Sequence, residues 1–230
     1  MDVLGEMGTW KLGDLPKGRE AVGCKWVFDI KHDHEGKISR YKARLVAQGY
    51  SQIPGMYYFE TFALVVRHDL LRAMLAIAAI WNLEIHQLDI KGAYLNGDLQ
   101  EEIYMRQPEG FDDGSGRVCR LYKTLYGLKQ SGREWNRKLN KRLTELGFSR
   151  NEVDHCVYVR ERNGETTVIT VWVDDLLVFT KTVEEGNELA RDLKDEFEVN
   201  DIGEPKMIIG VKINWDQENQ SLIISQKNYI

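Results

Sequence analysis

The sequence predicts an α+β fold in which helices cover one face of an antiparallel sheet. Beyond Leu83, segments with strand alternation and segments with helical spacing follow in the order strand, helix, strand, strand, helix, strand. That order is the ferredoxin-like split pattern. An Asn163-Gly164 pair between two apolar runs is a strong hairpin signal. Hydrophobic residues make up 43% and charged residues 29% of the 230 positions, which is a globular composition and excludes a disordered chain.

The N-terminal part is predicted to form a hairpin and then a helix. Strand character in "KWVFDIK" is followed by the turn "HDHEGK" and by a second strand, "RYKARLVAQGY", with Lys42 and Arg44 on one face. Asp69 is a good N-cap residue, and "LLRAMLAIAAI" follows it. Because this run is almost entirely apolar, we expect a helix that is buried on all sides.

The next strand, "LEIHQLDI", carries a carboxylate close to its end. Its alternation places Leu83, Ile85, Gln87 and Asp89 on one side. We therefore expect Asp89 to lie where the strand ends and its side chain can leave the sheet.

Two further helices are predicted from apolar residues at helical spacing. The first ends at Gly147 and has an inner stripe of Trp135, Leu139, Leu143 and Leu146. The second has an inner stripe of Leu189, Leu193 and Phe197. A last hairpin is expected from "KMIIGVKI" and "SLIIS".

The stretch "VWVDDLLVFT" places Asp174 and Asp175 between two apolar runs. Aspartate is common in turns, so an Asp174-Asp175 turn explains the pair when the stretch is taken alone. In the ferredoxin-like pattern, however, the first strand and the central hairpin are neighbours, which brings Asp89 to the same end of the sheet. Three carboxylates at one rim repel one another unless a cation binds them. The pattern therefore also favours a site for divalent metal ions.

Charge is distributed unevenly along the chain. The net charge of −5 by itself argues against a nucleic-acid partner. Basic residues nevertheless gather in 31–44 and in 117–142, whereas acidic residues gather in "VEEGNELARDLKDEFEVND". A solvated face explains any one such run, but two basic clusters with acid segregated elsewhere suit a partner that carries phosphate.

Cysteine usage and hydropathy indicate an intracellular protein. Cys24, Cys119 and Cys156 are scattered without a CxxC pair, which is typical of reduced thiols and gives no zinc pattern. The N-terminal segment lacks the basic start and apolar core of a signal peptide, and no apolar run is long enough to span a bilayer. We expect an intracellular location and no membrane partner.

Taken together, five stretches resemble the reverse transcriptase of copia-type LTR retrotransposons. They are "KWVFDIKHDHEGKISRYKARLVAQGY", "YFETFALVVR", "LEIHQLDIKGAYLNGDLQEEIYMRQPEGF", "VCRLYKTLYGLKQSGREWN" and "TVWVDDLLVFT". The resemblance runs from about Trp10 to the end of the chain. It implies an RNA-directed DNA polymerase with the fingers and palm of a right-hand polymerase. Residues 1–82, joined in part by 95–130, would be fingers-like, and residues 83–230 would be the palm with part of the connection to a thumb.

The resemblance also implies the catalytic residues. "LDIKGAY" matches the motif of the first catalytic aspartate, which is Asp89 here, and implies a backbone metal ligand at Ile90. "VDD" matches the second motif, so Asp174 and Asp175 are expected as the other catalytic and metal-binding carboxylates. Two Mg²⁺ ions, with Mn²⁺ as a substitute, are the implied cofactors, because these cations prefer oxygen ligands and neutralise charge in phosphoryl transfer.

Contacts to the incoming nucleotide follow from the same resemblance. Tyr94 matches the aromatic residue that lies beneath the sugar and excludes a 2′-hydroxyl, and an ordinary buried tyrosine is the alternative. "YGLKQSG" matches a template- and nucleotide-contacting motif, in which the contacting positions are Tyr126, Gly127, Lys129 and Gln130. Candidates for binding the triphosphate are Lys31, Lys42 and Arg44, for which a solvated strand face is an equal explanation.

Contacts to the nucleic acid are expected from two further places. The basic helix would hold backbone phosphates through Arg133 and Arg137, together with Lys129 before it. "MIIGVKI", around Ile209-Gly210, resembles the primer grip. The expected partners are an RNA or DNA template with its primer, deoxynucleoside triphosphates, and the remaining Pol segments, namely thumb, RNase H and integrase.

Four positions depart from the family pattern. The family usually has Pro at Leu64 and Gly132, Tyr at Trp172, and Asn or Thr at Gly92. The chain also stops at "SQKNYI", before the expected thumb. We therefore expect a truncated copy of the polymerase.

Two other functions remain open. One is a catalytically silent nucleic-acid-binding remnant, and the other is a different two-metal enzyme such as a nuclease. The intact Asp89, Asp174 and Asp175 favour a polymerase over a remnant. Tyr94 favours a polymerase over a nuclease, because a nuclease needs no residue that selects the sugar.

Overall fold

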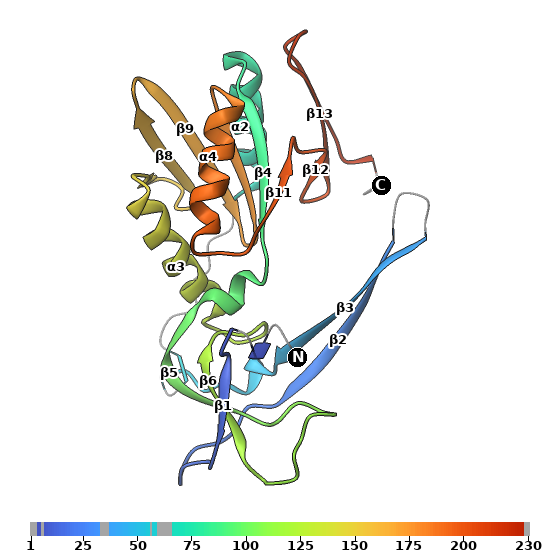
Figure 1. The fold of residues 1–230 in the computed structure, drawn as a ribbon, viewed down its shortest axis with the longest axis vertical. Coiled ribbons are helices and arrows are strands. Elements are labelled where there is room, and N and C mark those ends of the chain that lie inside the picture. The colour runs from blue at the N-terminus through green and yellow to red at the C-terminus, as the bar shows by residue number, and fades with distance from the viewer. Residues whose placement is uncertain (1–3, 6, 33–36, 56, 59–65, 228–230) are drawn as a thin grey trace. The chain divides into compact units, whose positions relative to one another are not determined.

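The computed structural model divides into two compact units. The first consists of Met1–Ala63 and Tyr94–Lys138, and the second consists of Leu64–Ala93 and Leu139–Ile230. Figure 1 shows the course of the chain through its strands and helices. The structure describes residues 4–5, 7–32, 37–55, 57–58 and 66–227.

Antiparallel strands form most of the first unit. One sheet has the order β1-β6-β5, and the hairpin β2-β3 forms the other. These strands are β1 (Trp10–Gly13), β2 (Cys24–His32), β3 (Ile38–Ala47), β5 (Asp98–Met105) and β6 (Val118–Lys123). The short 3₁₀ helices η1 (Gly49–Ser51) and η2 (Ala93–Asn96) follow β3 and β4. Its core is built from buried residues that include Leu45, Leu95, Ile103, Met105, Leu121 and Leu125.

The predicted N-terminal hairpin is confirmed. Val27 pairs with Arg44 and Asp29 pairs with Lys42 across β2 and β3. Because side chains alternate along a strand, Lys42 and Arg44 share one face of the hairpin. The middle of the predicted turn, residues 33–36, lies outside the described residues.

A six-stranded antiparallel sheet is the centre of the second unit. Its strand order is β11-β4-β10-β9-β8-β7. The strands are β4 (Glu84–Ile90), β7 (Ser149–Arg150), β8 (Val157–Arg162), β9 (Glu165–Trp172), β10 (Asp175–Thr180) and β11 (Val199–Gly203). Along the chain β4 is followed by β5, β6, α3, β7, β8, β9, β10, α4 and β11, so the predicted strands and helices occur in the predicted order, with β5, β6 and β7 as additional strands that were not predicted. The fold is therefore mixed α and β, with strands predominating.

Helices lie against both faces of this sheet. The C-terminal half of α3 (Ser131–Glu145) and α4 (Val183–Lys194) lie on one face, where the Tyr158 hydroxyl donates to Asn140 Oδ1 at 3.2 Å. Helix α2 (His68–Trp81) packs on the opposite face, against a core that includes Leu177 and Phe179 of β10. Figure 1 shows α4 and α2 on opposite sides of the sheet.

Helix α2 differs from its prediction in two respects. Its N-cap residue is Arg67, so Asp69 lies in the first turn of the helix rather than at the cap. The helix is also buried on one face only, because Ile80 is 75% exposed and Trp81 is 56% exposed. The prediction of burial on all sides was wrong, because the residues that pack against α2, from the six-stranded sheet and from the C-terminal strands, leave Ile80 and Trp81 uncovered.

The predicted stripes of α3 and α4 lie largely as expected. Trp135, Leu139 and Leu143 are buried, and Gly147 follows the end of α3 with a φ of 85°. Leu189 and Leu193 are buried on α4. Phe197 is also buried, but it lies beyond the end of the helix, where its backbone N–H donates to the Leu193 carbonyl at 2.9 Å.

The C-terminal residues form a separate three-stranded sheet. Its order is β12-β13-β14, with β12 (Met207–Ile208), β13 (Val211–Asp216) and β14 (Ser221–Ser225). The predicted last hairpin is confirmed as β13-β14. Ile208 and Ile213 belong to the same core as α2, so this sheet is part of the second unit.

Candidate active site

The strand register of the second unit brings the three predicted catalytic aspartates to one end of the sheet. Asp175 of β10 lies directly opposite Asp89 of β4. The Asp174 carbonyl accepts a 2.7 Å hydrogen bond from the Ile90 backbone N–H. Opposite residues of an antiparallel pair project from the same face of a sheet. Asp89 and Asp175 therefore share a face, with Asp174 in the adjoining turn.

The turn before Asp175 differs from the predicted Asp174-Asp175 turn by one residue. Strand β9 ends at Trp172 and β10 begins at Asp175, so the two turn residues are Val173 and Asp174. The one-residue shift places Asp175 in the ladder, opposite both Asp89 and Trp172. A two-residue hairpin loop requires positive φ angles, and Val173 supplies one with a φ of 53°. This conformation is strained for a β-branched residue.

An aromatic pair lies beside these carboxylates. The ring of Trp172 is 5.3 Å from that of His68, measured between centroids, with the planes tilted by 57°. Trp172 is the position where the related family usually has Tyr. The larger indole therefore has a packing partner on the first residue of α2.

The environment of Asp175 favours a bound cation. Burial raises the pKa of the Asp175 carboxyl, and the charges of Asp174 and Asp89 raise it further, whereas a hydrogen bond from Gln87 opposes the shift. That bond runs from Gln87 Nε2 to Asp175 Oδ1 at 3.1 Å. Hard oxygen ligands whose charges disfavour one another are the donor set that a divalent ion compensates. Within the described residues, no three His, Cys, Asp or Glu side chains stand in an arrangement that could hold a metal ion. The structure thus shows a shared location for the carboxylates, not a finished set of ligands.

Three predicted nucleotide-binding residues lie close together in the first unit. The rings of Tyr94 and Tyr126 meet edge to face, with centroids 4.9 Å apart. The Arg44 guanidinium lies over the Tyr126 ring, 5.7 Å from its centroid. Lys42 lies on the same face of the hairpin as Arg44, and the side chain of Lys31 is outside the described residues.

Gln130 is fully buried in a polar network. Its amide nitrogen donates to the Tyr57 carbonyl at 2.8 Å, and its amide oxygen accepts from Gln52 Nε2 at 3.1 Å. Gln52 Oε1 in turn accepts from the Lys129 backbone N–H at 2.8 Å. Gln52 was missed by sequence reasoning, since a single glutamine in a short 3₁₀ turn region carries no pattern. Gly127 adds close packing here, because a Cβ at this position would clash with the Ala47 carbonyl.

Arg133 is held by carboxylates of its own unit. It pairs with Glu101 at 2.9 Å and with Glu134 at 2.6 Å, and its side chain is only 16% exposed. Burial by itself lowers the pKa of Arg133, but the hydrogen bonds and charges of Glu134 and Glu101 raise the pKa overall. Arg137 also pairs with Glu134, at 3.2 Å, but its side chain is 63% exposed. Arg137 therefore presents more of its charge to solvent than Arg133 does.

Ile209 and Gly210 form the tight turn between β12 and β13. Both have positive φ angles, 49° and 74°, as a two-residue hairpin loop requires. Gly210 tolerates this conformation readily, whereas Ile209 is strained in it.

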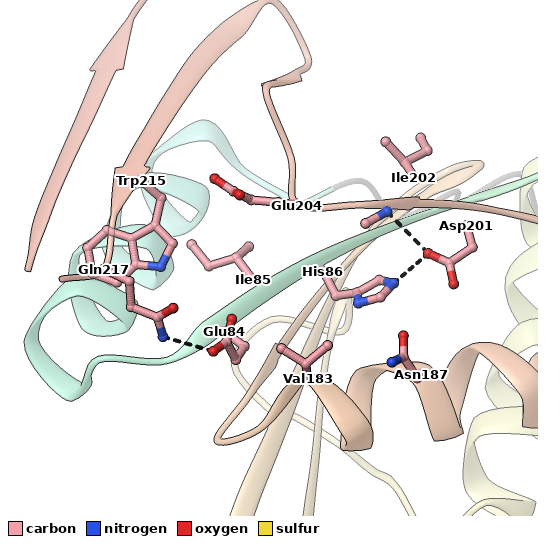
Figure 2. A pocket seen from close by; sticks show the side chains of 11 residues that line it. Glu84, Ile85, His86, Val183, Asn187, Asp201, Ile202, Glu204, Trp215 and Gln217 are labelled. Carbon is pink, nitrogen blue, oxygen red and sulfur yellow. Dashed lines mark hydrogen bonds and ion pairs between the residues drawn. The ribbon is translucent and has the colours of Figure 1, made fainter.

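A separate pocket lies toward the start of β4, away from Asp89 (Figure 2). Its volume is about 460 Å³, and its lining includes Glu84, Asp201 and Glu204 but no Lys or Arg among the described residues. Figure 2 shows His86 bonded to Asp201, through Nε2 and Oδ1 at 2.5 Å. A pocket lined by carboxylates repels phosphate, so it does not suit a nucleoside triphosphate or nucleic acid.

Comparison with known proteins identifies the family. The sequence model of the family "Reverse transcriptase (RNA-dependent DNA polymerase)" matches residues 7–230. The chain therefore belongs to the reverse transcriptase family, as the resemblance to copia-type retrotransposons predicted.

Several Pol polyproteins of retrotransposons are similar to the chain. The retrovirus-related Pol polyprotein from transposon TNT 1-94 of Nicotiana tabacum is 41% identical over 233 residues, which cover 100% of this chain and 18% of that protein. The one from transposon RE1 of Arabidopsis thaliana is 36% identical over 96% of this chain and 15% of its own length. The Ty1-LR2 Gag-Pol polyprotein of Saccharomyces cerevisiae is 32% identical over 86% of this chain and 11% of its own length. The chain thus spans less than a fifth of these relatives.

None of the helices in the described part of the chain is long and apolar enough to cross a membrane.

Proposed function

We propose that this chain catalyses RNA-directed DNA synthesis, with Asp89, Asp174 and Asp175 as its catalytic carboxylates. The observation that carries the proposal is the cross-strand pairing of Asp89 with Asp175 beside Asp174. The family match supports the reaction class. The sequence motifs contain these three residues, and the strand register places Asp89 opposite Asp175, beside the turn that contains Asp174.

The second unit is proposed to be the palm and the first unit to contain the fingers. The strand order β11-β4-β10-β9, with α3 and α4 in the connections, supports a ferredoxin-like palm. The basic face of the β2-β3 hairpin supports a role of the first unit in binding phosphate. Tyr94 is proposed as the residue that selects the sugar, and Ile209-Gly210 as part of the primer grip.

Two Mg²⁺ ions are the proposed cofactors. Asp89, Asp174, Asp175 and the Ile90 carbonyl would hold them, and bound magnesium supplies charge neutralisation and activation of the primer 3′-hydroxyl. The carboxylates keep this end of the sheet negative, so cations concentrate there. Gln87 fixes one oxygen of Asp175. Trp172 lies opposite Asp175 in the ladder between β9 and β10.

The proposed partners are a template with its primer, deoxynucleoside triphosphates and other Pol segments. The relatives are polyproteins much longer than this chain, which supports the last of these. We also propose an intracellular site of action, in a cytoplasmic particle or the nucleus, where an RNA template is accessible.

The test is primer extension on an RNA template with Mg²⁺, using this chain and a version extended by the following segment of a Pol polyprotein. Asp174→Asn is expected to reduce extension by about 1000-fold, because it removes charge at the reacting phosphate. Asp14→Asn is the matched control, since it removes one exposed carboxylate elsewhere and should change nothing. Extension by Asp174→Asn at near the wild-type rate would refute the assignment. Binding of primer–template without extension by either form would favour the silent remnant.

A further inference from the structure

Tyr126 touches two residues that are proposed to handle different parts of the nucleotide. Its ring meets Tyr94 edge to face at 4.9 Å, with an interplanar angle of 65°. The Arg44 guanidinium lies over the same ring at 5.7 Å. Edge-to-face rings attract each other, and a cation is attracted to the face of a ring. Tyr126 therefore links Tyr94, on the sugar side, with Arg44, a candidate for the triphosphate.

The backbone around Tyr126 is tied to the end of the strand that carries Arg44. The Tyr126 carbonyl accepts a 2.7 Å hydrogen bond from the Ala47 N–H. Gly127 packs so closely against Ala47 that a Cβ would clash with its carbonyl. The neighbouring side chains Leu125 and Leu128 are buried. Tyr126 is thus a fixed support rather than a loop residue that adapts to a ligand.

The backbone of Tyr94 is tied to the same segment. The Tyr94 carbonyl accepts hydrogen bonds from the Thr124 hydroxyl and from the Gly97 N–H, the latter at 3.0 Å. The Thr124 N–H donates to the Gly97 carbonyl at 2.9 Å. The Tyr94 backbone is therefore held by Thr124, which lies two residues before Tyr126 in the chain. With both backbones held by hydrogen bonds, the contact between the rings restrains the Tyr94 ring.

We propose that Tyr126 is a positioning residue that sets sugar selectivity by holding the Tyr94 ring in place. The inference rests on the proposed polymerase function. A ring excludes a 2′-hydroxyl only if it cannot turn aside, because a mobile ring yields to the extra oxygen at little cost. Tyr126 blocks that movement with its edge contact. It thus acts through Tyr94 and has no need to touch the nucleotide.

The inference is tested by the ratio of ribonucleotide to deoxynucleotide use. Tyr126→Leu keeps an apolar side chain but removes the aromatic edge, so relative ribonucleotide incorporation should rise by about three- to tenfold. Tyr126→Phe keeps the ring and should preserve the wild-type ratio. Tyr122→Leu is the matched control, because Tyr122 lies four residues earlier, faces Lys11 and Arg120, and should leave the ratio unchanged. Relative binding of UTP and dUTP, which differ only at the 2′ position, gives the same comparison without turnover when it is measured by calorimetry.

A double variant separates positioning from direct contact. If Tyr126 acts through Tyr94, adding Tyr126→Leu to Tyr94→Val should not raise the ratio beyond that of Tyr94→Val alone. An additive rise would show direct nucleotide contact and overturn the inference. An unchanged ratio in Tyr126→Leu, in an enzyme that extends primers, would also overturn it while leaving the proposed function intact. A wild-type chain that neither extends primers nor binds deoxynucleotides would overturn both. If circular dichroism shows that Tyr126→Leu is unfolded, Tyr126→Met is judged by the same ratio.

Discussion

Polar residues have opposite environments at the carboxylate end of the six-stranded sheet and in the segment from Tyr126 to Arg137. At the sheet end, Asp89 and Asp175 lie opposite each other, and burial and like charges raise the pKa of Asp175. In the other segment, Gln130 is fully hydrogen-bonded and Arg133 is paired with Glu101 and Glu134.

This difference distinguishes polar residues that can bind a ligand from polar residues that stabilise the fold. Like charges that lie together at one end of a sheet favour a bound cation, and their repulsion lowers stability until the cation binds. Charges that the fold pairs internally hold the architecture, and removing one partner leaves the other buried and unpaired. The carboxylates of the sheet end are thus the ones proposed to serve chemistry, whereas the paired residues serve packing.

The largest effect is expected for Asp175→Asn, which tests the carboxylate end of the sheet. Extension should fall by about 100-fold, less than for Asp174→Asn, because Asp175 also serves as a strand residue held by Gln87. The melting temperature should rise, since the amide has no charge to repel Asp89 and Asp174.

The stabilisation expected for Asp175→Asn should depend on pH, in a direction set by the raised pKa of Asp175. The folded-state pKa of Asp175 is raised, so the folded wild type binds a proton more tightly than the unfolded chain does. Its ionised carboxylate therefore costs stability at neutral pH, and this cost disappears as the pH falls and the group is protonated. The stability advantage of Asp175→Asn should shrink in the same direction. A variant less stable than wild type at neutral pH would show that the carboxylate is compensated after all.

A smaller effect is expected for Arg133→Met, which tests the segment where Arg133 pairs with Glu101 and Glu134. Methionine fills the space but removes Arg133 as the partner of Glu101 and Glu134, whose side chains are 10% and 4% exposed, and leaves Glu134 only its pair with the exposed Arg137. The free energy of unfolding should fall by about 3 kcal/mol. Arg137→Met is the matched control and should cost about 0.5 kcal/mol or less, because that side chain is 63% exposed. Urea denaturation measures both. Equal losses would mean that Arg133 is not an architectural residue.

The smallest effect is expected for Val173→Gly. Glycine adopts a positive φ without the strain of valine, so the free energy of unfolding should rise by about 1 kcal/mol. Asn163→Gly is the control, since asparagine already tolerates its φ of 55° and little should change. Primer extension by Val173→Gly should fall if the strained turn holds Asp174 in position. A more stable variant with full activity would show that the strain has no role in the reaction.

The sequence by itself determined the family, the helices α2, α3 and α4, the hairpins β2-β3 and β13-β14, and the motifs that contain the three aspartates. Alternation, helical spacing and the Asn163-Gly164 turn depend only on residues close together in the chain, so they can be recognised without the tertiary structure. Predictions from sequence patterns were wrong where a packing or pairing partner decides the outcome. Whether Ile80 and Trp81 are covered depends on what packs against α2, and whether the aspartate turn contains Asp175 depends on the register with β4.

Only the tertiary structure decided how the predicted contact residues are used. Gln130 and Arg133 match a contact motif, yet their burial depends on Gln52 and Glu101, which are distant in sequence and carry no pattern of their own. The contact of Tyr126 with Tyr94 likewise joins residues from separate segments. Hydrogen bonds, ion pairs and ring contacts act over a few ångströms in space, whereas sequence periodicity records only which face of its own element a side chain occupies.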